Sequence, residues 1–368
     1  MAFVFHNGNA LGLGAWRLVY PIKASHRSHR AAFDFLNSCD YLNKDKFLLD
    51  FLGIVGQEKA QNFYLDELYN LYRRADFNDL QSGFDYLLPY LPADKDAVIK
   101  VVEIIREREK QERTPFNWHG LIGAFSETTK VLGEVFAHRV DLIKSIYLDN
   151  LVNQDTDYHS KSFIQILDLD PKFVFEYVDW MYAHHEFLSR NNDHRNYNFL
   201  WERDDYKELM LDIIDYVFEK GENRFLDSYL EVFFVRHEGE VIESLEQRKL
   251  GVLKSYIQKN CHEQDSMICI FQLIADVFSH QHKELLATFL ECNQNFTDFK
   301  VLPFMPSMQM FHGSHIPVHE EEIKRLESLL PLFAGNLNLL QHRSNVEAQI
   351  EGLRRTIEYE VRREFIGR

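Results

Sequence analysis

The chain has 368 residues, a formal net charge of −16 and a sequence pI near 5.5. Hydrophobic residues make up 45% of it and aromatic residues 14%, a content that supports a buried core and argues against a disordered protein. An acidic surface repels phosphate backbones, so the charge argues against nonspecific binding of nucleic acid.

Cysteine usage and the N-terminal sequence predict the compartment. The four cysteines, Cys39, Cys261, Cys269 and Cys292, contain no C-x-x-C pair and are too few for a secreted disulfide scaffold, so we expect reduced thiols. The opening MAFVFHNGNALGLGAWR lacks the basic leader and long apolar run of a signal peptide, and no window is apolar enough to span a membrane. We therefore expect a cytoplasmic protein without a membrane partner.

Residues 1–25 are rich in glycine and poor in periodicity, which predicts an irregular lead-in. A phosphate-binding Walker A loop ends in Lys followed by Ser or Thr, because the ammonium and hydroxyl groups meet the phosphates and magnesium. Ala15 and Trp16 after the GLG sequence supply neither group, so we expect no nucleotide site and no cofactor here.

From about residue 29, apolar residues recur at helical spacing between short polar breaks, and strand-like alternation is nearly absent. Helices joined by short breaks pack as antiparallel neighbours. No tetratricopeptide or ankyrin signature recurs at a fixed period, so the pattern predicts an all-α fold, an irregular α-solenoid of antiparallel helix pairs. The predicted helices cover residues 29–38, 44–55, 57–73, 78–90, 95–111, 119–137, 139–152, 171–188, 204–219, 223–236, 240–259, 265–279 and 282–292.

Two seams divide this array. The stretch 110–120, KQERTPFNWHG, interrupts the periodicity at Pro115, and a second non-periodic stretch covers 189–203. Asp170 before Pro171 predicts a helix start, with Asp170 as the N-cap and Pro171 as the first helical residue. The predicted divisions are a lead-in at 1–25, an N-terminal helical array at 26–113, a central helical array at 114–295, and a connector with a terminal helical hairpin cap at 296–368.

Three prolines in the C-terminal connector, Pro303, Pro306 and Pro317, each fix φ and remove a backbone donor. They predict an ordered loop or turn up to about Pro317, which suits a first helical position. The apolar spacing that follows predicts a helix through Leu330 and Phe333, with Glu320, Glu321 and Glu322 in its first turn, where the helix dipole favours carboxylates.

Beyond Gly335 a second helix is predicted to run to about Phe365, because Val346, Ile350, Leu353, Ile357 and Val361 form one apolar stripe. Two pairs at four-residue spacing support its exposed face: Glu351 with Arg355, and Glu358 with Arg362. The stripe has two interpretations, a cap on the last helices of the array or a surface that pairs with another chain, and the cap is favoured.

Clustered histidines raise the possibility of a metal site. His312, His315 and His319 lie in or beside the connector, and His280, His282 and Glu284 form another set. A metal site holds three or four ligands in fixed geometry, and no H-E-x-x-H motif is present. We favour the alternative that these histidines cap helices and line a polar loop, so no metal is expected.

Other catalytic patterns have simpler explanations. The acidic pairs Asp204–Asp205 and Asp168–Asp170 lie at predicted helix starts, where capping explains them without acid–base chemistry. No nucleophile elbow G-x-S-x-G is present, and no base partner is evident for any cysteine. We therefore expect no enzymatic activity, although an unrecognised active site among the helices stays open as a less favoured alternative.

The seam at 189–203 contains the only candidate binding residues. Arg195, Tyr197, Phe199 and Trp201 combine aromatic rings with a positive charge on a predicted loop, and such residues dominate interface energetics. They are candidates for binding a protein partner. The favoured alternative is that Phe199, Leu200 and Trp201 fold back onto a neighbouring helix.

Several stretches resemble a known family. The runs NFTDFKVLPFMP, GSHIPVHEEEIKRLESLLPLF and LLQHRSNVEAQIEGLRRTIEYEVRREF, with ILDLDPKFVFEYVDWMY and RDDYKELMLDIIDYVF upstream, resemble the C-terminal helical region of large bacterial STAND-type NTPases, several of which act in anti-phage defence. The resemblance covers roughly residues 160–366 and involves packing residues rather than a catalytic signature.

In that family a P-loop motor precedes a helical-repeat sensor, and target binding to the sensor licenses nucleotide-driven assembly. The resemblance therefore implies the sensor portion, because the motor motif is absent from this sequence. We expect a non-catalytic helical-repeat module that binds a foreign or partner protein, with an NTPase domain supplied in cis or in trans. The alternative is a stand-alone helical adaptor or scaffold protein.

Overall fold

The computed structural model describes residues 26–40, 42–55, 62–81, 84, 95–122, 134–153, 160–184, 197–220, 226–235, 243–306 and 314–366. These residues form helices joined by turns, with no strand among them, so the predicted all-α class is confirmed. The chain divides into two compact units, Met1–Arg195 and Asn196–Arg368. The division falls inside the stretch 189–203, which the sequence marked as a seam.

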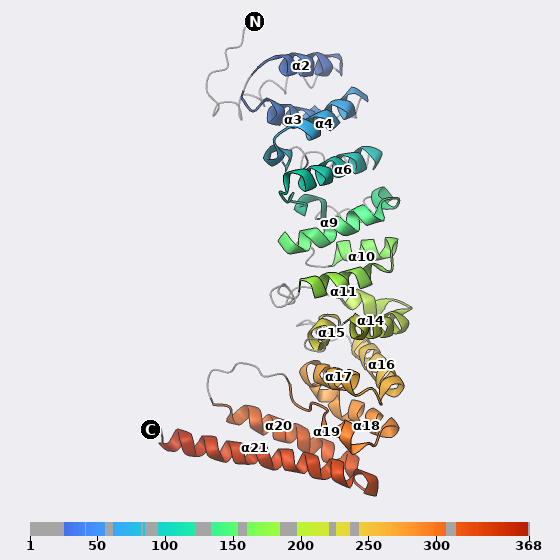
Figure 1. Cartoon of the computed structure of the whole chain (residues 1–368), viewed down its shortest axis with the longest axis vertical. Coiled ribbons are helices and arrows are strands. Elements are labelled where there is room, and N and C mark those ends of the chain that lie inside the picture. Colours follow the sequence, from blue (N-terminus) through green and yellow to red (C-terminus); the bar gives the residue numbers. More distant parts are fainter. Residues whose placement is uncertain are drawn as a thin grey trace. The chain divides into compact units, whose positions relative to one another are not determined.

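Within the first unit, described helices that are neighbours in the sequence contact each other (Figure 1). Contacts join α2 to α3, α3 to α4 and α4 to α6, and then α9, α10 and α11 to one another. Large buried aromatic rings, including Phe33, Tyr72, Trp118, Tyr147 and Phe173, fill the spaces between these helices. The helices are α2 (His26–Ser38), α3 (Lys44–Val55), α4 (Asn62–Arg74), the 3-10 helix η2 (Phe77–Asp79), α6 (Lys95–Glu112), α9 (Val140–Asn153), α10 (Lys161–Leu169) and α11 (Phe173–Ala183).

The second unit begins with the short helix α13 (Asn198–Glu202), followed by α14 (Tyr206–Lys220), α15 (Leu226–Phe234), α16 (Glu243–Asn260), α17 (Gln264–Val277), η5 (Ser279–Gln281) and α18 (His282–Cys292). Contacts here also join alternate helices, since α16 packs on both α14 and α18, and α15 packs on α17. Each of these helices therefore has more than one packing partner within the unit.

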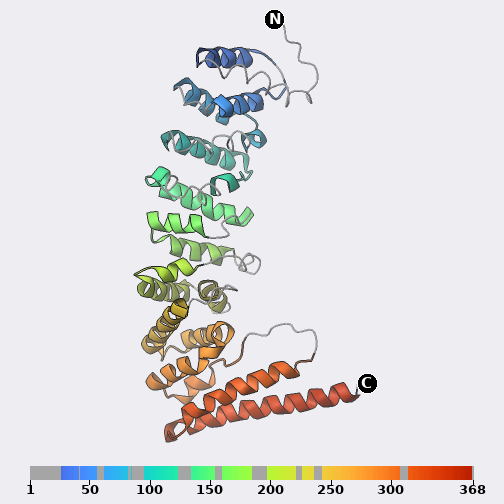
Figure 2. The same cartoon turned by 180° about the vertical axis from the view of Figure 1, so that it is seen from behind.

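The unit ends in two long helices that lie side by side in both views (Figures 1 and 2). The short helix α19 (Phe296–Lys300) and the turn after it precede α20 (Ile316–Leu329). The 3-10 segments η6 (Leu330–Phe333) and η7 (Leu337–Leu339) then lead into α21 (Leu340–Ile366). None of the described helices is both long and apolar enough to cross a lipid bilayer.

Most predicted helices that fall on described residues are present, and the ranges 44–55 and 282–292 match α3 and α18 at both ends. The prediction missed three short α-helices, α10, α13 and α19, the last of which lies in the connector that was predicted to be a loop or turn. In α10 only nine residues carry the pattern, and an apolar run of that length does not distinguish a helix from a buried strand. The predicted lead-in at 1–25 and most of the predicted helices 78–90 and 119–137 lie outside the described residues.

The predicted helix start at Asp170 and Pro171 is wrong. Helix α11 begins at Phe173, and Pro171 lies in the preceding turn. The Asp170 carboxylate accepts a hydrogen bond from the backbone N–H of Lys172 at 3.0 Å, and the Asp170 carbonyl accepts one from the N–H of Phe173 at 3.0 Å. Asp170 therefore closes the turn between α10 and α11 instead of capping α11.

The C-terminal hairpin corrects two further details. Pro317 lies in the first turn of α20 as predicted, but because α20 begins at Ile316 the glutamates at 320–322 lie beyond that turn. The α-helix ends at Leu329, and the next four residues, which include Pro331, form a 3-10 helix. Gly335 has φ +80°, a backbone conformation that favours glycine, and it separates the two helices as predicted.

Helix α21 has 27 residues, so it is about 40 Å long, and it ends within one residue of the predicted end at Phe365. The expected charge pairs are present, with 3.3 Å between Arg355 and Glu351 and 4.0 Å between Arg362 and Glu358. The apolar stripe is buried at Val346 and Ile350 and only half-buried at Leu353. Packing of α21 is therefore tightest near its start, beside α19 and η6.

Candidate functional site

The aromatic residues singled out from the sequence lie in and beside α13. Tyr197 is 3% exposed and Trp201 is fully buried, whereas Phe199 is partly exposed. Tyr197, Leu200 and Trp201 follow one another at helical spacing and share the buried face of this short helix. That spacing is the signal by which the sequence could have revealed a helix here. Arg195 lies outside the described residues.

The indole ring of Trp201 is held by contacts to α15. Its Nε1–H donates a hydrogen bond to the carbonyl of Phe233 at 2.9 Å, and its ring packs edge-on against Phe234 with centroids 5.0 Å apart. The ring of Tyr197 packs against that of Phe233 at 5.2 Å. Burial of Tyr197 and Trp201 favours the packing alternative, and it leaves Phe199 as the described member of the set that reaches the surface.

Two basic residues of α16 complete this cluster. The guanidinium group of Arg248 donates to the Trp201 carbonyl and lies over the ring of Tyr206, 4.7 Å from its centroid. The buried Lys249 ammonium donates to the carbonyls of Phe234 and Val235 at 3.1 and 3.2 Å. These carbonyls close α15, so Lys249 satisfies acceptors that a helix end leaves open.

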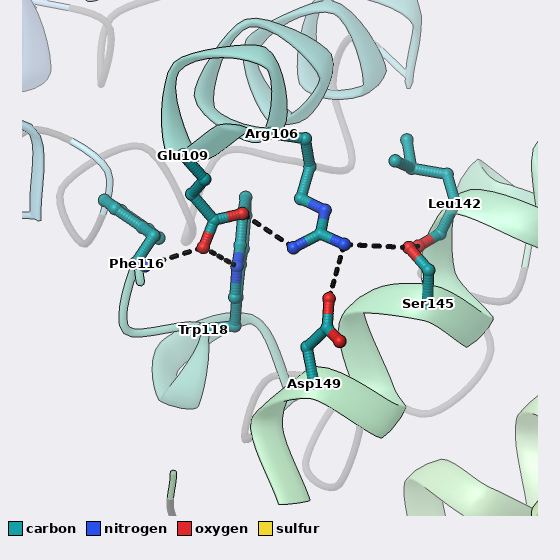
Figure 3. Close-up of polar contacts among 7 residues, drawn as sticks. All are labelled: Arg106, Glu109, Phe116, Trp118, Leu142, Ser145 and Asp149. Atoms are coloured by element: carbon teal, nitrogen blue, oxygen red, sulfur yellow. Dashed lines mark hydrogen bonds and ion pairs between the residues drawn. The ribbon is translucent and has the colours of Figure 1, made fainter. Parts of the chain in front are cut away.

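A second polar cluster lies in the first unit, where α6 meets the turn that follows it (Figure 3). The Glu109 carboxylate accepts hydrogen bonds from the backbone N–H of Phe116 at 2.6 Å and from Nε1–H of Trp118 at 3.2 Å. Its other oxygen lies 2.7 Å from the Arg106 guanidinium. Glu109 thus ties the chain between Phe116 and Trp118 to α6, next to a cluster of aromatic rings.

Arg106 extends the same cluster to α9 (Figure 3). One guanidinium nitrogen lies 2.5 Å from the Asp149 carboxylate and 3.2 Å from the Ser145 hydroxyl. Burial alone would lower the pKa of Arg106, but hydrogen bonds to Asp149 and Glu109 outweigh that effect and raise it. The guanidinium is therefore a permanent positive charge that links α6 to α9.

Lys144 of α9 forms a further polar cluster in the first unit. Its ammonium lies 2.8 Å from the Asp170 carboxylate and 2.5 Å from that of Glu176, so it links α9 to the α10–α11 turn and to α11. Burial opposes the charge on Lys144, but the two hydrogen bonds prevail and raise its pKa above the ordinary value. The hydrogen bond from Lys144 in turn lowers the pKa of Asp170.

The histidines of interest lie in different surroundings. His315 and His319 stack with ring centroids 6.3 Å apart, and His319 pairs with Glu322 at 3.1 Å, whereas His312 lies outside the described residues. His280 is exposed and His282 is fully buried. Across the described ranges, no three His, Cys, Asp or Glu side chains come together in a group that could hold a metal ion.

His282 and His342 are the exceptional polar side chains of the second unit. They are 0% and 1% exposed, and neither ring nitrogen of either residue has a hydrogen-bond partner among the described residues. Buried polar groups are ordinarily paired, so two unpaired imidazoles in one unit require an explanation. The sequence did not predict that these two histidines are buried, because burial of a histidine depends on which elements cover it.

Taken together, the polar clusters around Glu109, Lys144 and Lys249 join neighbouring helices and satisfy backbone groups. The charges of Glu109 and Lys144 are paired within the chain, and the Lys249 ammonium is hydrogen-bonded to backbone carbonyls, an arrangement suited to holding a helical scaffold in register. No protein-family model matches the chain, and no curated protein or solved structure matches it.

Proposed function

We propose that this chain is a non-catalytic protein-binding module, an irregular α-solenoid that serves as the target-sensing part of a STAND-type NTPase system. The bound species would be a foreign or partner protein, and the NTPase domain would act on the same chain or as a separate subunit. The proposal combines the packing of the helices with the resemblance of residues 160–366 to that family.

One observation carries the proposal: within each unit, helices that are close in the sequence pack on one another. An array of this kind leaves one side of each helix available, and such arrays bind macromolecules along an extended surface. The ion pairs that Lys144 and Arg106 make with partly exposed carboxylates support the same role, because they join neighbouring helices. The start of the apolar stripe on α21, which is buried at Val346 and Ile350, fits a cap at the end of the array, whereas Val361 at its far end is exposed.

Affinity isolation of the full chain from its host, at native expression level, tests this proposal. Phe199→Ala changes a partly exposed ring in α13, and Phe35→Ala is the matched control, because Phe35 is 60% exposed on α2 in the other unit. We expect the wild-type chain to retain one protein in near-stoichiometric amount, Phe199→Ala to retain several-fold less, and Phe35→Ala to behave as wild type.

The identity of the retained proteins separates the two candidate roles. A P-loop NTPase among them supports the sensor role, whereas other proteins alone would indicate a stand-alone adaptor. Retention of no protein by the wild-type chain, or ATP turnover by the purified chain itself, would contradict the proposal.

A further inference from the structure

The turn that leads from α18 to the C-terminal hairpin lies between two buried histidines. On one side, the His282 ring of α18 stacks on Phe304 with centroids 5.6 Å apart and contacts Phe271 of α17 at 5.8 Å. Residues 296–306 therefore contact α17 and α18 through the rings of Phe304, His282 and Phe271. This contact joins the hairpin to the preceding helices of its unit.

On the other side, the His342 ring of α21 lies among three phenylalanines. The centroid distances are 4.5 Å to Phe299, 5.5 Å to Phe296 and 6.4 Å to Phe333. Phe299 also packs against Phe304 at 5.3 Å, so the two imidazoles belong to one continuous aromatic cluster. We call this cluster, formed by His282, His342 and the rings around them, the histidine junction.

The histidine junction favours the neutral form of both imidazoles. Neither ring has a hydrogen-bond partner among the described residues, and a charged imidazole buried without one is strongly disfavoured. Burial, reinforced by the nearby charge of Arg325, lowers the pKa of His282 to about 3. Burial likewise lowers the pKa of His342.

The charged groups around His282 do not compensate a proton on it. Arg325 of α20 is the cation that acts on the ring, and its guanidinium donates to the Phe304 carbonyl. Asp276 of α17 and Glu321 and Glu322 of α20 act on Arg325. None of these carboxylates is hydrogen-bonded to the His282 ring.

The elements around His342 also carry charges that are engaged elsewhere or exposed. Asp298 of α19 accepts a hydrogen bond from the amide of Asn293 at 3.0 Å, and Lys300 is exposed. Arg343 of α21 pairs with Glu347 on the exposed face of that helix at 2.8 Å. A proton on His342 would therefore also remain unpaired.

We propose that the histidine junction is an acid-sensitive latch, in which protonation of His282 and His342 releases residues 296–306 and the α20–α21 hairpin from α17 and α18. In the released form both rings reach water and regain an ordinary proton affinity. Because the packed form binds fewer protons than the released form, lowering the pH favours release. The latch does not depend on the proposed protein-binding role.

The size of the effect follows from proton linkage. With an ordinary histidine pKa of about 6.5 in the released form, the equilibrium for releasing His282 shifts by about 30-fold between pH 7.5 and pH 5. His342 acts in the same direction, so the two shifts multiply. For His282 the change falls between about pH 6.5 and pH 3, and carboxylates also titrate in the lower part of that range.

Hydrogen exchange followed by mass spectrometry on the full chain tests the latch. Protection factors, corrected for the intrinsic pH dependence of exchange, are measured at about pH 7.5 and about pH 5. We expect protection in residues 296–306, α20 and α21 to fall by about 30-fold or more, while protection in α16 falls far less. A double variant, His282→Phe with His342→Phe, should lose most of this pH dependence because neither position titrates.

Two controls make the outcome specific. His282→Gln with His342→Gln also removes both titrations while keeping polar side chains, and His262→Gln changes an exposed histidine and should behave as wild type. An equal loss of protection in α16, or the same loss in either double variant, would overturn the latch.

If both double variants fail to fold, ¹⁵N NMR of the wild-type imidazoles decides. The latch requires neutral rings in the packed state, with protonation appearing together with loss of amide protection. Titration of both rings near their ordinary pKa while α21 stays protected would refute it.

Discussion

Truncating Trp201 is the most decisive test of how the second unit is built. Trp201 is fully buried, its indole N–H donates to the Phe233 carbonyl at 2.9 Å, and its ring contacts Phe234. Trp201→Ala removes this packing and leaves the Phe233 carbonyl without its donor. The same substitution separates a core residue from a partner-binding residue, since only a core residue contributes to folding in the absence of a partner.

The expected cost follows from these contacts. Replacing a buried tryptophan by alanine destabilises a protein by about 3–5 kcal/mol. The orphaned Phe233 carbonyl adds about 1–3 kcal/mol where water does not reach it. We therefore expect a loss of about 4 kcal/mol or more for Trp201→Ala. Trp201→Phe keeps a ring and loses the donor, so it should cost about 1–3 kcal/mol.

Urea unfolding of the full chain, followed by far-UV circular dichroism, measures these changes. Trp201 is the only tryptophan in Asn196–Arg368, and the other three lie in the first unit, so the part of the wild-type fluorescence change that Trp201→Phe removes reports on the second unit. The matched control is Phe199→Ala, on the partly exposed side of the same helix, with an expected cost below about 1.5 kcal/mol. A loss below about 1 kcal/mol for Trp201→Ala would refute the packing argument and favour partner binding.

Three further predictions concern individual contacts, each measured as a change in the free energy of unfolding. Glu109→Gln should cost about 1–3 kcal/mol. The carboxylate accepts hydrogen bonds from Arg106 and from two N–H groups, and a neutral amide weakens all three. An unchanged stability would mean that the cluster in Figure 3 is not formed. Lys144→Met should lower the free energy of unfolding by about 1–3 kcal/mol at neutral pH. The difference between wild type and variant should shrink at low pH, because the stability that comes from the lowered pKa of Asp170 is lost as the pH falls through that pKa. Gly335→Ala should cost about 1–2 kcal/mol, because φ is +80° at that position. Gly352→Ala, at an exposed position inside α21 with open space around it, should stabilise the protein by about 0.5–1 kcal/mol. Equal effects of the two substitutions would contradict the positive φ of Gly335.

Helix positions were predictable where the periodic signal was long. The predicted range 44–55 coincides with α3 and 282–292 with α18, since each pattern extends over about three helical turns. The short α10, α13 and α19 were missed because nine, five and five residues carry too little periodicity. The turn at Pro171 was misassigned because an Asp–Pro pair suits a turn as well as a helix start.

The candidate site was less predictable than the fold. Arg195, Tyr197, Phe199 and Trp201 were grouped because they alternate with polar residues, a pattern read as a loop. In the structure Tyr197 and Trp201 lie four residues apart on one buried face, and Phe199 lies on another. The contacts of Trp201 come from α15 and α16, whose distance in the sequence hides them from any local pattern.

The helical class of the described chain follows from the sequence alone, because the 3.6-residue spacing of apolar side chains is a local property. Tertiary structure decided which of those side chains meet and which polar groups they enclose. Lys144 finds its carboxylates 26 and 32 residues away, and the rings that surround His342 come from α19 and from η6. Burial, and the pKa shifts that result from it, depend on such distant contacts, so only the folded chain reveals them.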